Sequence, residues 1–357
     1  MHRPLPIPSV EDWELIREIS GRFAHLTLAE LTPALLSEIE RSDGVDAATA
    51  LAFDRAWHHP VNRACIESVA RWYDAPRQPL DACDAAFLVV PNGGYEVDPA
   101  SQQMCEQLLE AARRHGFGTA IVPASSTSSL DSNANLVLNT LASRRERVLV
   151  VASISVGSAQ FKLAIERSAG HEVWQRVRAW VNVCGLVDGT PVANLLLDNL
   201  NESDVAMYVR WFGNLGEATV RQMIEVSREA GRGADRILGK PLGLPEGIHL
   251  LNVVPFPLRR HVIYEHTRLF HDVLSQLGPN DGFGLIADML QKPGELYPVW
   301  GADHYINLST DVGRLADALL CHTWQRMQEG LGCQRHPTTA GPCMATDQFR
   351  NDKHVVA

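Results

Sequence analysis

Residues 148–160 read VLVVASISVGSAQ, and this stretch decides how the chain is interpreted. Its first half is a run of apolar, mostly β-branched residues, which is typical of a buried strand. The run stops at three serines and a glycine, and the next residues, QFKLAIERS, have the spacing of a helix. The stretch therefore predicts a strand that turns abruptly into a helix through small, polar residues.

Five other segments carry the same strand signal, and helical patterns separate them. In chain order they read AAFLVV, FGTAIVPA, VRAWVNVCGL, GIHLLNVVPF and ELYPVW, with VLVVAS as the third of the six. Strands that alternate with helices indicate an α/β protein with a mostly parallel sheet, flanked by helices on both faces.

The remaining segments predict how the chain is divided. Residues 1–83 lack strand signals and are predicted to form a helical N-terminal extension, with Ser9 capping a helix that begins at Val10. Residues 84–331 form the α/β domain, in which 188–246 are a largely helical insertion that we expect to act as a cap. The polar, irregular residues 332–357 predict a disordered tail. Six apolar residues of the insertion are expected to line a pocket or to be simply core: Leu195, Leu196, Leu197, Met207, Trp211 and Phe212.

Composition excludes several classes of protein. The 357 residues carry a net charge of −10 with no long basic run, which disfavours nucleic acid as the partner. The seven cysteines are scattered without a CxxC pair, which predicts neither a disulfide framework nor a structural zinc site. Reduced thiols, and no apolar stretch typical of a signal peptide or a membrane span, favour a cytoplasmic protein. The oligomeric state is left open.

The turn at the end of the third strand fits a nucleophile elbow, in which a tight strand-to-helix turn exposes one serine hydroxyl. Ser155 is flanked two residues away on each side by Ser153 and Gly157, which are small enough for such a turn. The N–H of Val156, at the start of the helix, would stabilise an oxyanion. A loop without a catalytic role explains the motif equally well. Ser153 and Ser158 compete with Ser155, although they occupy the flanking positions.

The loop after the first strand, PNGGY, has glycines that let backbone N–H groups approach a ligand closely. An N–H near Gly93 would supply a second oxyanion donor, and Gly94 and Tyr95 would contact the substrate. A dinucleotide-binding turn is disfavoured because YEVD follows the two glycines instead of the G-x-G-x-x-G pattern. A plain structural turn remains an alternative.

Two late loops add an acid and a base. GPNDG contains Asp281, and GADHY contains His304 directly after the strand ELYPVW. Together with Ser155 they give the chain order Ser, Asp, His. Asp288 and Asp303 are alternatives to Asp281 as the carboxylate that pairs with His304. Asp288 falls in an apolar run that predicts a helix, and Asp303 adjoins His304, so its side chain would point elsewhere if the backbone there is extended.

Residues 84–325 resemble the α/β-hydrolase superfamily and are similar to bacterial lipases and esterases. Four stretches match in order: LVVPNGGY resembles the oxyanion loop, SISVGSA the elbow, GLVDGTPVAN the segment after the next strand, and PNDGFG with GADHYINL the acid and histidine loops. The histidine usual in the oxyanion loop is replaced by Pro91 or Asn92. Ile306 stands where some lipases have a calcium-binding aspartate, so no such calcium site is expected.

The resemblance implies a serine hydrolase that cleaves acyl esters through an acyl-enzyme. Ser155 would be the nucleophile, His304 the general base and Asp281 its orienting acid. The N–H groups of Val156 and Gly93 would form the oxyanion hole. The expected substrate is a small-molecule or lipid-like acyl ester, with no cofactor and no metal. A thioesterase or acyltransferase with the same triad, and a non-catalytic binding module on this scaffold, remain alternatives.

Overall fold

The computed structural model describes residues 5, 7–75, 79–80, 82, 84–194, 201–202, 206, 216–233 and 236–330. The tail 332–357 lies outside these ranges. The six apolar residues of the insertion named above also lie outside them.

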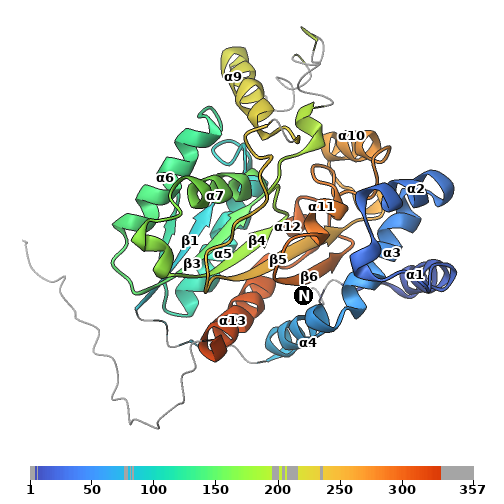
Figure 1. Cartoon of the computed structure of the whole chain (residues 1–357), viewed down its shortest axis with the longest axis horizontal. Coiled ribbons are helices and arrows are strands. Elements are labelled where there is room, and N and C mark those ends of the chain that lie inside the picture. The colour runs from blue at the N-terminus through green and yellow to red at the C-terminus, as the bar shows by residue number, and fades with distance from the viewer. Residues whose placement is uncertain are drawn as a thin grey trace, which may run out of the picture.

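A six-stranded sheet forms the centre of the molecule, and all of its pairings are parallel. The strand order is β2-β1-β3-β4-β5-β6 (Figure 1). Each of the six predicted strand segments is confirmed, with bounds β1 (Ala85–Val90), β2 (Gly118–Ile121), β3 (Val148–Ile154), β4 (Val177–Val183), β5 (His249–Phe256) and β6 (Glu295–Trp300).

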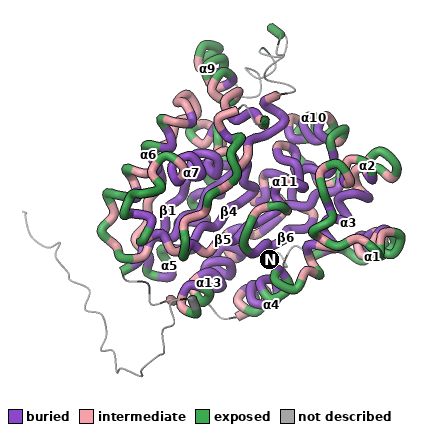
Figure 2. The backbone as a smooth tube through the Cα atoms, viewed as in Figure 1, coloured by how far each residue is buried: buried purple, intermediate pink, exposed green. Residues whose placement is uncertain are grey.

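Both faces of the sheet are covered, which explains why its strands are apolar along their whole length. Alternate side chains such as Phe87 and Val150 pack under α4 (Pro60–Asp74), α5 (Pro99–Arg114) and α13 (Val312–Gly330). Their neighbours, Leu88 and Val151 among them, pack under α6 (Leu130–Ser143) and α7 (Val156–Arg167). The strands consequently form the buried centre in Figure 2.

The N-terminal helices cover the β5–β6 end of the sheet. The helix predicted from Ser9 begins at Val10, and Ser9 and Asp12 form a capping box at its start. This helix, α1 (Val10–Arg22), packs with η1 (Leu28–Glu30), α2 (Pro33–Asp43) and α3 (Val45–His58) in one apolar cluster with β5 and β6. The Phe53 ring of α3 lies 4.7 Å from that of Trp300, whose indole N–H donates to Asp12. The extension is therefore packed onto the core rather than detached from it.

Part of the described insertion lies over the edge of the sheet where the strands end (Figure 1), while Leu238, Leu242 and Leu244 pack on the face covered by α6 and α7. The part over the strand ends includes α9 (Glu217–Ser227) and η4 (Arg228–Ala230). The Gln222 side chain donates to the Thr127 carbonyl at 3.0 Å, and the Glu229 carboxylate accepts from the Leu130 N–H at 2.7 Å. The remaining elements are η2 (Glu172–Gln175), η5 (Arg259–His261), α10 (Glu265–Leu274), α11 (Ile286–Leu290) and α12 (Ile306–Ser309).

Candidate active site

The turn between β3 and α7 holds Ser155 in an unusual backbone conformation. Its φ is 53° and its ψ is −124°, although side-chain-bearing residues rarely adopt a positive φ. The Ser155 N–H donates to the Val183 carbonyl of β4 at 3.1 Å, which anchors the turn to the neighbouring strand. Such strain persists only where the surrounding structure enforces it, and it is concentrated at functional sites.

The small residues on either side of Ser155 serve two different purposes. A Cβ added at Gly157 would lie 2.5 Å from the carbonyl oxygens of Val90 and Pro91, so only glycine fits there. Ser153 is fully buried, and its hydroxyl accepts from the Trp180 indole N–H and pairs with the Ser158 hydroxyl, each at 2.7 Å. Of the three serines that compete in the sequence, Ser155 is the one that lines the pocket shared with His304.

The structure brings Ser155, His304 and Asp281 into one hydrogen-bonded chain. His304 Nε2 lies 2.8 Å from Ser155 Oγ, and His304 Nδ1 lies 2.8 Å from Asp281 Oδ2. A carboxylate only accepts hydrogen bonds, so the imidazole proton is on Nδ1 and Nε2 accepts from the serine hydroxyl. The arrangement leaves Nε2 positioned to remove a proton from Ser155.

Asp281 is fixed from its other side. It is fully buried, and its Oδ1 accepts from the N–H groups of Phe283 at 2.9 Å and Gly284 at 2.7 Å. The His304 N–H donates to the Asp281 carbonyl at 2.9 Å, which joins the two loops directly. These contacts leave Oδ2 as the carboxylate oxygen that faces the imidazole.

The two competing acids are held elsewhere. Asp288 lies in α11, as its apolar surroundings predicted, and its carboxylate pairs with Arg232 at 2.8 Å. Asp303 accepts from the N–H groups of Ile263 and Tyr305, each at 2.9 Å. Burial raises the pKa of both carboxyl groups.

The two segments proposed to supply oxyanion donors lie side by side. A Cβ added at Gly93 would be 3.4 Å from Val156 Cγ1, and both residues line the same pocket as Ser155. Val156 is the first residue of α7, where N–H groups have no acceptor within the helix. Gly94 also lines this pocket, but its N–H donates to Ser126 Oγ at 2.6 Å.

Tyr95 is not brought to the pocket, although the sequence predicted a substrate contact for it. The chain folds back after Gly94, whose carbonyl accepts from the N–H groups of Val97 and Asp98. As a result, the Tyr95 ring packs against the apolar core beneath α5.

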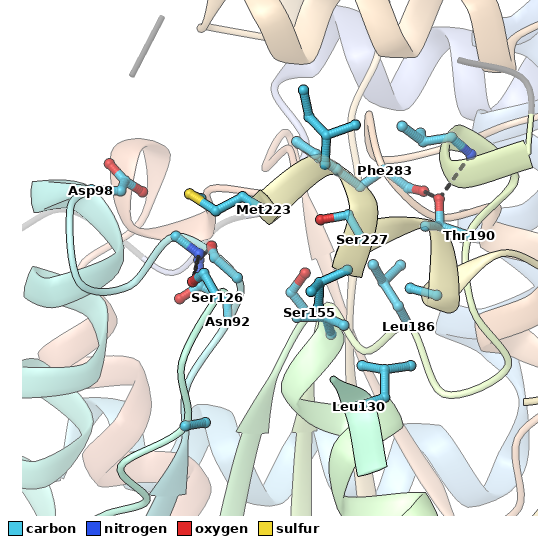
Figure 3. Close-up of a pocket in the computed structure, with 18 of the residues that line it drawn as sticks. Asn92, Asp98, Ser126, Leu130, Ser155, Leu186, Thr190, Met223, Ser227 and Phe283 are labelled. Carbon is cyan, nitrogen blue, oxygen red and sulfur yellow. Dashed lines mark hydrogen bonds between the residues drawn. The ribbon is translucent and has the colours of Figure 1, made fainter. Parts of the chain in front are cut away.

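The pocket above Ser155 and His304 has a volume of about 180 Å³. Figure 3 shows Met223 and Ser227 of α9 above Ser155, with Leu186 and Leu130 on the opposite side from Asn92 and Ser126. Its apolar lining includes Leu130, Leu186, Val192, Val220, Met223 and Ile224. Its polar lining includes Asn92, Ser125, Ser126, Ser128 and Asn133.

Sequence reasoning missed two parts of this lining. The serine-rich loop of residues 125–129 follows β2, and its position after a parallel strand is the signal that would have indicated it. His266 and Tyr305 also line the pocket, with His266 Nε2 and the Tyr305 hydroxyl 3.3 Å apart. Burial lowers the pKa of His266, which favours its neutral form. No spacing in the sequence marked this pair.

Comparison with known proteins identifies the fold. No protein-family description matches the chain, and no curated protein matches its sequence. Among solved structures it is similar to the metagenomic carboxyl esterase MGS0156, with 18% identity over 72% of this chain and 79% of that one, and a TM-score of 0.52. It also matches the mature form of Bacillus licheniformis lipase BlEst2, with 14% identity over 71% of this chain and 95% of that one, and a TM-score of 0.44.

The parallel sheet flanked by helices and its likeness to the carboxyl esterase show that this chain has the α/β-hydrolase fold, as the sequence predicted. Among the described residues, no helix is both long enough and apolar enough to span a bilayer.

Proposed function

We propose that the protein is a serine hydrolase that cleaves carboxylic esters through an acyl-enzyme. The observation that carries this proposal is the position of the His304 imidazole, 2.8 Å from Ser155 Oγ on one side and 2.8 Å from the Asp281 carboxylate on the other. The strained backbone at Ser155 supports the same reading, because a serine without a role would not require it.

In this mechanism His304 takes the Ser155 proton while Oγ attacks the ester carbonyl carbon. The tetrahedral intermediate collapses as His304 protonates the departing alcohol, which leaves an acyl-serine. Water, deprotonated by the same imidazole, then attacks the acyl-serine and releases the acid. Asp281 keeps the proton on Nδ1 and stabilises the imidazolium that forms in each step.

The N–H groups of Val156 and Gly93 are proposed to hold the negative charge that develops on the carbonyl oxygen. The amino-terminal end of α7 adds a partial positive charge at the same place. One such donor typically contributes about 2.7–4 kcal/mol of transition-state stabilisation.

The pocket lining favours a small-molecule or lipid-like acyl ester. The apolar side formed by Leu186, Met223 and Ile224 suits an acyl chain, and residues 188–246 are proposed to act as the cap that carries part of it. We also propose a cytoplasmic location, because the four cysteines in the described residues, Cys65, Cys105, Cys184 and Cys321, are all free thiols.

Substitution of the nucleophile tests the proposal. Ser155→Ala is expected to abolish p-nitrophenyl ester hydrolysis and labelling by a fluorophosphonate probe, with an unchanged circular dichroism spectrum. Ser143→Ala, which changes an exposed serine of α6, is the matched control and should retain wild-type turnover. Unchanged turnover in Ser155→Ala would contradict the mechanism.

A second measurement separates hydrolysis from acyl transfer. An acyl-thioester substrate is supplied in water with and without an added alcohol or amine, and the acid is quantified against the transfer product. Predominant transfer product would identify an acyltransferase with the same triad. Absence of labelling in a folded wild-type sample would favour the non-catalytic alternative.

A further inference from the structure

A second cluster of reactive side chains lies at the opposite edge of the sheet from Ser155. Glu295 is the first residue of β6, and its Oε2 is 2.7 Å from His322 Nε2 on α13 and 3.4 Å from His249 Nε2 on β5. Cys65 of α4 completes the group. In a parallel sheet the strands begin at one edge and end at the other, so this cluster is separated from the proposed triad by the length of the strands.

The cluster is compact and buried. One ligand atom from each of Cys65, Glu295 and His322 lies within 4.8 Å of the others, and these residues are 0%, 5% and 2% exposed. No other set of three histidine, cysteine or carboxylate groups in the described residues meets this distance. Thiolate, imidazole and carboxylate are the ligands that zinc takes in proteins, in four-coordinate tetrahedral sites.

We propose that Cys65, Glu295 and His322 form a structural zinc site, and that His249, whose Nε2 lies 3.4 Å from Glu295 Oε2 but outside the 4.8 Å group, moves in to supply the fourth ligand. The Cys65 thiolate and the Glu295 carboxylate together balance the charge of Zn²⁺. Both imidazole Nε2 atoms approach the same carboxylate oxygen, at 2.7 Å for His322 and 3.4 Å for His249, so both rings lie on the side of Glu295 where the ion would bind. Zinc is favoured over calcium or magnesium because those ions prefer all-oxygen ligand sets.

The surroundings of the cluster fit a bound cation despite a nearby arginine. Arg326 donates to Glu295 Oε1 at 3.0 Å, which fixes the carboxylate and leaves Oε2 facing the histidines. Residues that orient a metal ligand from behind are a regular part of zinc sites. A second cavity is lined in part by His249, Arg326 and Met327, so it reaches the histidine and the arginine that contact Glu295.

Metal binding displaces two protons, one from the His322 ring nitrogen Nε2 and one from the Cys65 thiol. His322 Nδ1 has no hydrogen-bond partner among the described residues, so it accepts the ring proton when Nε2 binds the metal. Cys65 supplies the thiolate ligand and loses its proton on binding. Zinc binding breaks the S–H bond, forms the Zn–S bond and releases the proton to solvent.

A zinc ion here would connect α4 and α13 to the first residues of β5 and β6. The sequence predicted no zinc because its cysteines show no CxxC pair. That argument applies to sites built from one short segment. The absence of a CxxC pair says nothing about residues 65, 249, 295 and 322, which lie far apart in the sequence and are brought together only by the fold.

Metal titration of the full chain tests the site. The protein is stripped with a chelator and titrated with Zn²⁺ by calorimetry, and with Co²⁺ by absorption. We expect one ion per chain, a rise in thermal unfolding temperature, and a near-ultraviolet thiolate-to-cobalt charge-transfer band. Cys65→Ala should lose that band and His322→Gln should lose the one-to-one binding. Cys105→Ala, which removes a buried cysteine outside the cluster, should keep both.

X-ray absorption of the zinc-loaded wild-type protein keeps the proposal testable if the variants fail to fold. The expected spectrum has one sulfur at about 2.3 Å and nitrogen or oxygen ligands at about 2.0–2.2 Å. Failure of the wild-type chain to bind zinc stoichiometrically, a spectrum without sulfur, or full binding by folded Cys65→Ala would each overturn the site.

Discussion

Replacing Asp281 by asparagine tests the proposed mechanism through the orientation of a single amide. Asp281 Oδ1 accepts two backbone N–H groups, from Phe283 and Gly284, and Oδ2 faces His304 Nδ1. In Asp281→Asn the amide oxygen must take the place of Oδ1, because an NH₂ group there would face two donors. The reversed orientation would lose two hydrogen bonds of about 1 kcal/mol each and bury the unpaired N–H groups.

The fixed amide then forces the wrong tautomer on the histidine. The asparagine NH₂ faces His304 Nδ1 and donates to it, so the imidazole proton moves to Nε2. An Nε2–H group donates to Ser155 and is unable to accept its proton. In a serine protease the equivalent change lowers kcat by about 10⁴, and we expect the same order here, or about 5 kcal/mol of transition-state stabilisation.

The assay is steady-state hydrolysis of p-nitrophenyl butyrate, with the rate of fluorophosphonate labelling as a second measure of serine reactivity. Both rates should fall together, while the urea unfolding midpoint changes little. Asp288→Asn alters a competing acid that pairs with Arg232, and it should stay within about twofold of wild type, since a partly exposed ion pair contributes little. A loss smaller than tenfold in folded Asp281→Asn would refute the proposed role of the carboxylate.

Three further predictions follow from the packing. Gly157→Ala should destabilise the fold by about 1–3 kcal/mol in urea unfolding, because its Cβ would lie 2.5 Å from two carbonyl oxygens, whereas Gly170→Ala has open space and should not. Met223→Trp should fill part of the pocket that α9 covers, and should lower kcat/KM for octanoyl esters at least tenfold, or about 1.4 kcal/mol of transition-state stabilisation, relative to acetyl esters. An unchanged ratio of the two kcat/KM values would contradict this. Burial lowers the pKa of His271 from 6.5, so protonation favours the unfolded chain and the free energy of unfolding falls as the pH drops below 6.5. His271→Leu should flatten this fall in the free energy of unfolding between about pH 7.5 and 5.5. Equal slopes of unfolding free energy against pH in the variant and the wild type would refute the prediction.

The sheet and the positions of Ser155 and His304 were predictable for one physical reason. Parallel strands must end at the same edge, so the residues that follow the third and sixth strands, Ser155 and His304, lie at that edge in any correct fold. Asp281 is less constrained, since α10 separates it from β5. Its position depends on the hydrogen bond between the His304 N–H and its own carbonyl, which no pattern in the sequence encodes.

The loops themselves were not predictable at the level of single side chains. Tyr95 was expected to contact the substrate, yet the chain folds back through hydrogen bonds from the Val97 and Asp98 N–H groups to the Gly94 carbonyl, and the Tyr95 ring packs against the core. In the same region Glu96 accepts from both the N–H and the hydroxyl of Ser126, and that hydroxyl accepts from Gly94. These contacts join loops thirty residues apart in the sequence, and the spacing of residues within either loop does not predict them.

The strand beside the elbow explains why position 153 holds a serine. The motif needs a small residue there, and glycine is the commoner choice. Here Trp180 of β4 points its indole N–H at this position and is itself fully buried, so a glycine would leave that donor without an acceptor. A buried unpaired donor costs about 1–3 kcal/mol, which exceeds the cost of one hydroxyl in a turn that accommodates it. The departure at Ser153 therefore reflects the large neighbour on β4, and it does not count against an elbow at Ser155.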